Sequence, residues 1–103
     1  MYVSVTRVNT DGLPPETSTI VAQEVHRWLD DIEGFEGFLM LAREGTTLSV
    51  SFWESREVAE RHRLARAQVR ERATAVAGAE IEDVFEYEVV YARLGPRLIE
   101  PRG

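Results

Sequence analysis

Apolar residues recur along the chain with two different spacings, and these spacings divide the chain into strands and helices. Alternation of apolar and polar residues predicts a strand over residues 2–8, another over Thr46–Trp53 and a last one over residues 81–93. Phe35–Arg43 is apolar at nearly every position, which is typical of a strand whose two faces are both covered.

Two segments carry apolar residues at helical spacing instead. The first follows Pro14 and Pro15, ends at Gly34, and has its stripe at Val21, Val25, Trp28, Leu29 and Ile32. For the second helix, Ser55 is suited to be the N-cap and Gly78 to end it. Its stripe is predicted at Val58, His62, Ala65, Val69, Ala73 and Val76.

The order strand, helix, strand, strand, helix, strand consists of two split βαβ halves. It predicts an α+β, ferredoxin-like domain over residues 1–93, with a four-stranded antiparallel sheet and both helices on one face. Residues 94–103 form a tail that is loosely ordered or lies on a partner subunit. Because Phe35–Arg43 is apolar on both faces and no residues remain to cover the open one, we expect a second copy of the sheet to cover it.

Composition narrows the classes of function. The 103 residues suffice for one domain and contain no cysteine, which excludes disulfides, thiol nucleophiles and zinc–cysteine sites. A net charge of −6 does not favour nucleic-acid binding. No apolar run is long enough for a membrane span and no signal peptide is recognisable, so a cytoplasmic protein is expected. All 12 basic residues are arginine, and glutamates are interleaved with the arginines of residues 56–72. These charges form either a solvated face of ion pairs or a rim that attracts an anionic ligand.

Three stretches together resemble one known family. GFEGFLML (residues 34–41), WES (residues 53–55) and VFEYEVV (residues 84–90) are similar to the antibiotic biosynthesis monooxygenases, small proteins of the dimeric α+β barrel superfamily. The resemblance implies a homodimer formed through the sheet face and a pocket between sheet and helices. It also implies oxidation of a small aromatic, polyketide-like phenol or quinol by molecular oxygen without a cofactor. The protein then supplies a dry, shaped pocket and hydrogen bonds to an oxyanion.

The alternative is a non-catalytic or haem-binding member of the same superfamily, so whether the chain is an enzyme stays open at this point. The haem-degrading branch uses an asparagine on its first strand, a tryptophan in its second helix and a ligating histidine further along that helix. Asn9 or Arg7 matches the asparagine, and His62 stands in the place of the tryptophan. Residues 69–72 (VRER) provide no ordinary axial ligand for haem iron where the histidine should be.

Three residues are candidates for the site. His62 on the apolar stripe is either a core residue or a general base that accepts a phenolic proton beside a cavity. Trp53 either closes the core or forms a wall for a flat ligand. Asn9 is either a turn residue or an amide that binds an oxygen or carbonyl of the substrate.

The remaining polar residues suggest no further catalytic group. His26 is predicted to lie on the surface, and two distant histidines without a third ligand make a poor metal site, so no metal is expected. The chain contains no nucleotide-binding or flavin-binding glycine motif. Glu86 and Glu88, on one face of the last strand, are expected to pair with arginines rather than to act as an acid–base pair.

Overall fold

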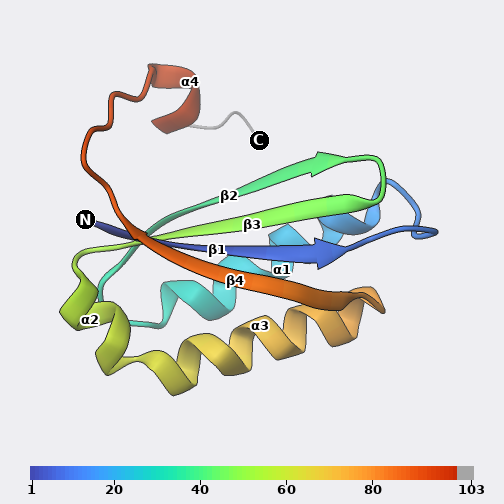
Figure 1. Cartoon of the computed structure of the whole chain (residues 1–103), viewed down its shortest axis with the longest axis horizontal. Coiled ribbons are helices and arrows are strands. Elements are labelled where there is room, and N and C mark those ends of the chain that lie inside the picture. The colour runs from blue at the N-terminus through green and yellow to red at the C-terminus, as the bar shows by residue number, and fades with distance from the viewer. Residues whose placement is uncertain (100–103) are drawn as a thin grey trace.

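A computed structural model describes residues 1–99 of the chain as one α+β unit (Figure 1). Along the chain the elements are β1 (Tyr2–Asn9), α1 (Thr17–Asp30), β2 (Phe35–Arg43), β3 (Thr46–Trp53), α2 (Arg56–Arg61), α3 (Arg63–Ala77), β4 (Glu80–Glu88) and α4 (Pro96–Ile99). The predicted bounds of β2 and β3 are confirmed residue for residue.

The four strands form one sheet in the order β2-β3-β1-β4, and every neighbouring pair is antiparallel. Helices α1 and α3 lie on the same side of this sheet, and α4 is set apart from it, beyond the edge strand β2 (Figure 1). This is the ferredoxin-like βαββαβ arrangement that the sequence predicts.

Strand alternation gives the two faces of the sheet different chemistry. On β1, the residues facing the helices are Tyr2, Ser4, Thr6 and Val8, and all four are buried. Apolar residues gather between this face and the helices in a core of Tyr2, Val21, Val25, Leu29, Trp53 and Ala59. The predicted stripe of α1 is confirmed, because Val21, Val25 and Leu29 are buried and Trp28 and Ile32 pack against them.

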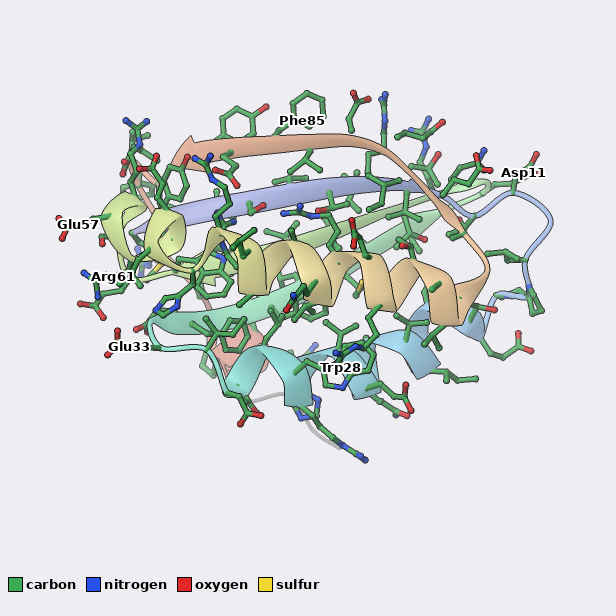
Figure 2. The ribbon with its side chains drawn as sticks, turned by 90° about the horizontal axis from the view of Figure 1, so that it is seen from below. Asp11, Trp28, Glu33, Glu57, Arg61 and Phe85 are labelled. Atoms are coloured by element: carbon green, nitrogen blue, oxygen red, sulfur yellow. The ribbon has the colours of Figure 1, made fainter. Side chains whose placement is uncertain are left out.

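The opposite face of the sheet is largely apolar and partly exposed within the described residues, with the Arg7–Asp83 ion pair towards one end. Register places Val3 and Val5 beside Phe52 and Val50 of β3 and beside Tyr87 and Phe85 of β4. Tyr87 is 55% exposed and Phe85 is 41% exposed. Phe85 projects from β4 away from α3 (Figure 2).

The last strand is shorter than predicted, ending at Glu88 instead of residue 93. The reason is the position of its partner: Glu88 pairs with Tyr2, the first residue of β1, so no neighbouring strand continues beyond it. One further backbone bond joins Val89 N to Met1 O at 2.9 Å. Val90 and Tyr91 are consequently 94% and 80% exposed.

The predicted second helix is two helices, α2 and α3, and the predicted stripe is confirmed in part. Ser55 is the N-cap, its Oγ accepting from Val58 N at 3.1 Å, and Gly78 ends α3 with φ 69°, both as predicted. Between them His62 leaves the helical conformation (φ −105°, ψ 28°). Val69 and Ala73 pack against the core as predicted; Arg66 and Ala77 also lie inward, whereas Val76 is 54% exposed.

Gly34 permits the close approach of the α1–β2 connection to α2. Its φ is +87°, and a Cβ added there would overlap Cγ1 of Val58. We expect Gly34→Ala to lower the free energy of unfolding by about 2–5 kcal/mol, because a left-handed backbone and a core clash add together. Gly78→Ala is the matched control: φ is +69° but no atom lies within 4 Å, so only about 1 kcal/mol should be lost. If urea unfolding shows the same loss of stability for Gly34→Ala and Gly78→Ala, the clash with Val58 is contradicted.

The C-terminal segment is exposed beyond β4. The described part of the tail includes the short helix α4, and Leu94 and Leu98 are 52% and 59% exposed. The rest of the predicted tail, residues 100–103, lies outside the described residues. None of the helices that the structure describes combines the length and the apolar character needed to cross a membrane.

Candidate functional site

A cavity lies between the helix-facing side of the sheet and helices α1 and α3. The volume open to the centres of water molecules is about 80 Å³. Its apolar walls come from α1, β2, β3 and α3, and include Val21, Val25, Leu29, Phe38, Met40, Trp53 and Val69. The only ionisable side chains among its described lining residues are Arg66 and Arg70 of α3.

Hydroxyl groups form the floor of the cavity. Ser4 pairs with Ser51, and Thr6 with Ser49, so four hydroxyls from β1 and β3 lie side by side on one face. Such a face would ordinarily carry apolar side chains to fill a core. The Ser4 hydroxyl is buried and has no hydrogen-bond partner within the described residues. A buried polar atom without a partner is uncommon and is suited to bind a ligand atom or water.

Trp53 closes one end of this floor. It has no exposed surface, its Nε1 donates to Ser51 Oγ at 2.8 Å, and its ring meets that of Phe35 edge-on at 5.6 Å. It is also one of the residues that line the cavity. Both readings of Trp53 from the sequence therefore fit its position, since the ring belongs to the core and also faces the cavity.

Arg66 holds a charge inside this region. Its side chain is buried; Nε donates to the Ala59 carbonyl at 2.8 Å, and Nη1 donates to Glu86 Oε2 at 3.0 Å. The guanidinium lies 5.5 Å from the Trp53 ring centre, within the range of a cation–π contact. The other oxygen of Glu86 accepts from Tyr2 Oη at 3.0 Å. Glu86 therefore pairs with an arginine as expected, and on the helix-facing side of the sheet.

Opposing influences act on the Glu86 carboxyl. Burial by itself raises its pKa, but the hydrogen bond and charge of Arg66, the Tyr2 hydroxyl and the charge of Arg70 together outweigh burial and lower the pKa. A lowered pKa in the folded protein stabilises the fold above the pKa of the unfolded chain, and this stability is lost as pH falls through the folded value.

We expect Glu86→Gln to lower the free energy of unfolding at neutral pH by about 1–3 kcal/mol, because the charge of Arg66 stays buried without its counter-ion. The difference from wild type should begin to shrink below the usual glutamate pKa of 4.5, and it should close only below the lowered pKa of folded Glu86, where the wild-type side chain also becomes neutral. Glu88→Gln is the control: Glu88 is 3.7 Å from Arg56 and both are exposed, so less than about 0.5 kcal/mol should change. If urea unfolding at acid pH still shows a stability difference between Glu86→Gln and wild type, the Arg66–Glu86 ion pair is not its cause.

A second group of hydroxyls lies at the far end of the cavity. Thr47 Oγ1 is 3.3 Å from Thr10 Oγ1 and 3.1 Å from Ser18 Oγ. These residues also line a second hollow, formed by the loop of residues 10–15 and the β2–β3 turn. The group therefore separates the cavity from the loops at this edge of the molecule.

His62 lies outside the lining of this cavity, contrary to the prediction that a ring nitrogen faces it. The non-helical His62 sits at the junction of α2 and α3, with its side chain 26% exposed. Its buried Nε2 has no hydrogen-bond partner within the described residues and is 3.6 Å from Glu33 Oε1. Glu33 also pairs with Arg61 at 3.2 Å, and the two lie together at the α2 end of the molecule (Figure 2).

Asn9 is also placed outside the cavity lining. It is exposed at the end of β1, and its Oδ1 accepts from Asp11 N at 2.9 Å, which is the turn geometry that the sequence offered as one reading. His26 is exposed, as predicted. Within residues 1–99, no three histidine, aspartate or glutamate side chains are grouped to hold a metal ion.

Of the three sequence candidates, only Trp53 lines the cavity. The residues that the sequence analysis missed are the hydroxyl floor and the two arginines Arg66 and Arg70. A signal for the floor was present, because serine and threonine alternate along β1 and β3 on the face opposite Leu48, Val50 and Phe52. The arginines follow His62 at four-residue steps on the same helix face, but a charged side chain is not expected to be buried, so they were not placed on the stripe.

Fold and cavity together define the class: a ferredoxin-like α+β protein with a ligand-sized space between its sheet and its helices. Neither a family model nor a curated protein matches the chain. Several solved structures, however, have a similar fold. A mutant of SnoaB, a cofactor-independent oxygenase from Streptomyces nogalater, has a TM-score of 0.66 at 18% identity, over 88% of this chain and 94% of that one.

Two further structures agree. The monooxygenase from the gene ActVA-Orf6 of Streptomyces coelicolor, in complex with nanaomycin D, has a TM-score of 0.64 at 19% identity, over 91% of both chains. A proposed antibiotic biosynthesis monooxygenase from Deinococcus radiodurans has a TM-score of 0.56 at 17% identity, over 91% of this chain and 97% of that one. The chain therefore has the fold of the antibiotic biosynthesis monooxygenases, as the resemblance in its sequence implied.

Proposed function

We propose that the protein is a cofactor-independent monooxygenase that oxidises a small aromatic, polyketide-like compound in the cavity between sheet and helices. The observation that carries this proposal is the cavity itself, with apolar walls, the Trp53 ring and a floor of hydroxyls. Apolar walls with a few polar groups are typical of sites for flat organic ligands. The fold shared with SnoaB and the ActVA-Orf6 monooxygenase supports the proposal by analogy.

The size of the cavity limits the substrate. Its volume of about 80 Å³ holds roughly five to eight water molecules, at about 10–15 Å³ each. Because each water occupies about 30 Å³ of liquid, the displaced volume is on the order of 150–240 Å³. This corresponds to an aromatic compound of two fused rings, so a three-ring anthrone requires α1 or α3 to move away from the sheet.

For an anthrone, the proposed reaction converts the ring methylene to a carbonyl and reduces the other oxygen atom to water. The substrate first loses a proton and becomes an enolate, which transfers an electron to oxygen; the resulting radicals combine into a peroxide at that carbon. Loss of the second hydrogen as a proton then breaks the oxygen–oxygen bond. Hydroxyl donors such as Ser4 stabilise the negative oxygen of the enolate, as fixed dipoles do in a dry site.

The role of His62 as general base stays a prediction, and its position outside the cavity gives it no support. No described lining residue carries a carboxylate or an imidazole. We therefore expect His62→Ala to retain oxygen uptake within about threefold of wild type, because a base must lie within hydrogen-bond reach of its proton. A loss of a hundredfold or more, with the fold intact by circular dichroism, would restore His62 as the base.

The protein is also proposed to form a homodimer through the open sheet face. Val3, Val5, Phe52, Phe85 and Tyr87 share this face, and an apolar surface of this kind is usually an interface. A second copy offers the same apolar surface, so a twofold pairing covers both at once. Light scattering should give a mass of twice 11.7 kDa.

A non-catalytic binding protein is the second candidate, favoured by the lack of an ordinary acid or base in the described lining. Its haem-binding version is not favoured, because the residues of α3 that reach the cavity include Val69 and Arg70 rather than a ligating histidine. A haem titration that saturates at one equivalent per subunit would reverse this preference.

The proposed function is tested by oxygen uptake with chelator-treated protein and an anthrone or a hydroquinone. The expected result is uptake well above the autoxidation measured with heat-denatured protein, with one oxygen molecule consumed per anthrone. Uptake no faster than that background for both substrate classes would leave the binding protein as the better description.

A further inference from the structure

Arg70 differs from the other cavity-lining arginine in having no carboxylate in direct contact within the described residues. Arg66 donates to both a carbonyl and Glu86, whereas the Arg70 guanidinium makes no ion pair or hydrogen bond within residues 1–99. It lies one helical turn after Arg66 on α3 and is half-buried. Burial and the nearby charge of Arg66 lower the pKa of Arg70, yet an arginine stays protonated at neutral pH.

The local charges do not balance. At the cavity, the two positive charges of Arg66 and Arg70 are opposed by the one negative charge of Glu86, which is hydrogen-bonded to Arg66. The charge of Glu71 also attracts Arg70, but Glu71 is exposed and does not line the cavity. The protein as a whole has a charge of −6, so this positive excess belongs to the cavity and not to the molecule. A half-buried charge without a partner is costly unless something neutralises it.

A second unsatisfied donor lines the same cavity. The Ser4 hydroxyl is buried and unpaired within the described part of the chain, and Ser4 is the β1 partner of Glu86 in the sheet. A guanidinium and a hydroxyl are the donors that an anionic oxygen accepts most readily. Both project into a space whose remaining walls are largely apolar.

We propose that the cavity selects an aromatic monoanion, with the negative oxygen of the ligand bound by Arg70 and supported by Ser4. The ligand charge would neutralise the excess positive charge, and its ring would occupy the apolar part near Trp53. This assignment rests on the proposed use of the cavity as a ligand site and adds the charge of the compound that enters it. The anion is a carboxylate or a phenolate, since both present the same oxygen chemistry.

Calorimetric titration with a matched pair of ligands tests this inference. The carboxylate 2-naphthoate and its neutral amide have nearly the same shape, so their difference in affinity measures the charge. A hydrogen bond to a charged group contributes about 1.5–3 kcal/mol, so naphthoate should bind about ten- to a hundredfold more tightly. Equal affinities, or no binding of either ligand, would overturn the proposal.

Variants of the arginines test whether the preference for naphthoate over its amide depends on Arg70. Arg70→Gln should reduce it to less than about threefold, whereas Arg70→Lys, which keeps the charge, should retain most of it. Arg72→Gln is the matched control, because Arg72 lies on the same helix but outside the cavity, over the Trp28 ring at 4.9 Å. A preference that survives Arg70→Gln would place the anion elsewhere. If that variant does not fold, Arg70→Met, which keeps much of the length of the side chain without its charge, takes its place with the same expected loss.

Whether a phenolate is bound is tested by measuring the affinity for 2-naphthol over a range of pH. If the phenolate is the preferred form, its affinity should rise with pH in wild type and stay flat in Arg70→Gln; if only a carboxylate fits, it should stay flat in both. The result is separable from the proposed function, because binding is measured without turnover. Anion preference without oxygen uptake refutes the oxygenase, and oxygen uptake without anion preference refutes this inference.

Discussion

Phe85→Arg is expected to weaken the dimer by about a thousandfold or more. The phenylalanine is 41% exposed in the single chain and lies on the open sheet face, so the substitution should leave the monomer folded. In the proposed dimer, each interface would receive two arginines, one from each copy, on a surface that is largely apolar beyond the Arg7–Asp83 ion pair. A thousandfold rise in the dissociation constant corresponds to a loss of about 4 kcal/mol in the free energy of dimerisation. Burying two charges without partners can cost more than this.

The neighbouring residue provides the control. Val84 is similarly exposed, at 40%, but alternation places it on the helix-facing side of the same strand. Val84→Arg should therefore leave the dimer intact in sedimentation at micromolar concentration. If both variants dissociate, or if neither does, the open face is not the interface.

Ser49→Phe is expected to lower kcat/KM for the aromatic substrate by about a hundredfold or more. Ser49 lies in the centre of the hydroxyl floor, and a phenylalanine ring there would occupy the space that the substrate needs. Even a displacement of about 1 Å from the reactive geometry costs about a hundredfold in rate. Because the ring enters an existing cavity, the melting temperature should stay the same or rise.

Ser49→Ala is the control that distinguishes the effect of filling the cavity from the effect of losing the Ser49 hydroxyl. It keeps the cavity open, so its kcat/KM should fall by less than about tenfold, the effect of one hydrogen bond. Oxygen uptake that is unchanged in Ser49→Phe, with the variant still folded, would show that the reaction occurs elsewhere.

The alternation of side chains made most of the fold predictable from the sequence. β2 and β3 are found at their predicted bounds, because each is delimited by glycines or by a cap residue such as Ser55. The end of β4 could not be predicted in this way. Its sequence continues to alternate after Glu88, but a strand also needs a neighbour, and β1 begins opposite that residue.

The candidate site was less predictable, for two physical reasons. A helix stripe is assigned from its apolar residues, so Val69 and Ala73 were placed correctly, but Arg66 was left out because a charged side chain is not expected to be buried. The pattern of buried residues also cannot distinguish a packed core from a cavity. Helices can shield a sheet face from solvent while the space between helices and sheet is left partly empty. Trp53 was identifiable because it ends a strand directly before a cap, a position that alternation fixes.

The most direct test of the account is oxidation under heavy-isotope oxygen gas, with the product analysed by mass spectrometry. Chelator-treated wild-type protein and an anthrone should give a quinone with one labelled oxygen atom, and Ser49→Phe should give no more of it than the protein-free reaction. Label that enters from water rather than from oxygen gas, or equal yields from wild type and Ser49→Phe, would contradict oxidation in this cavity.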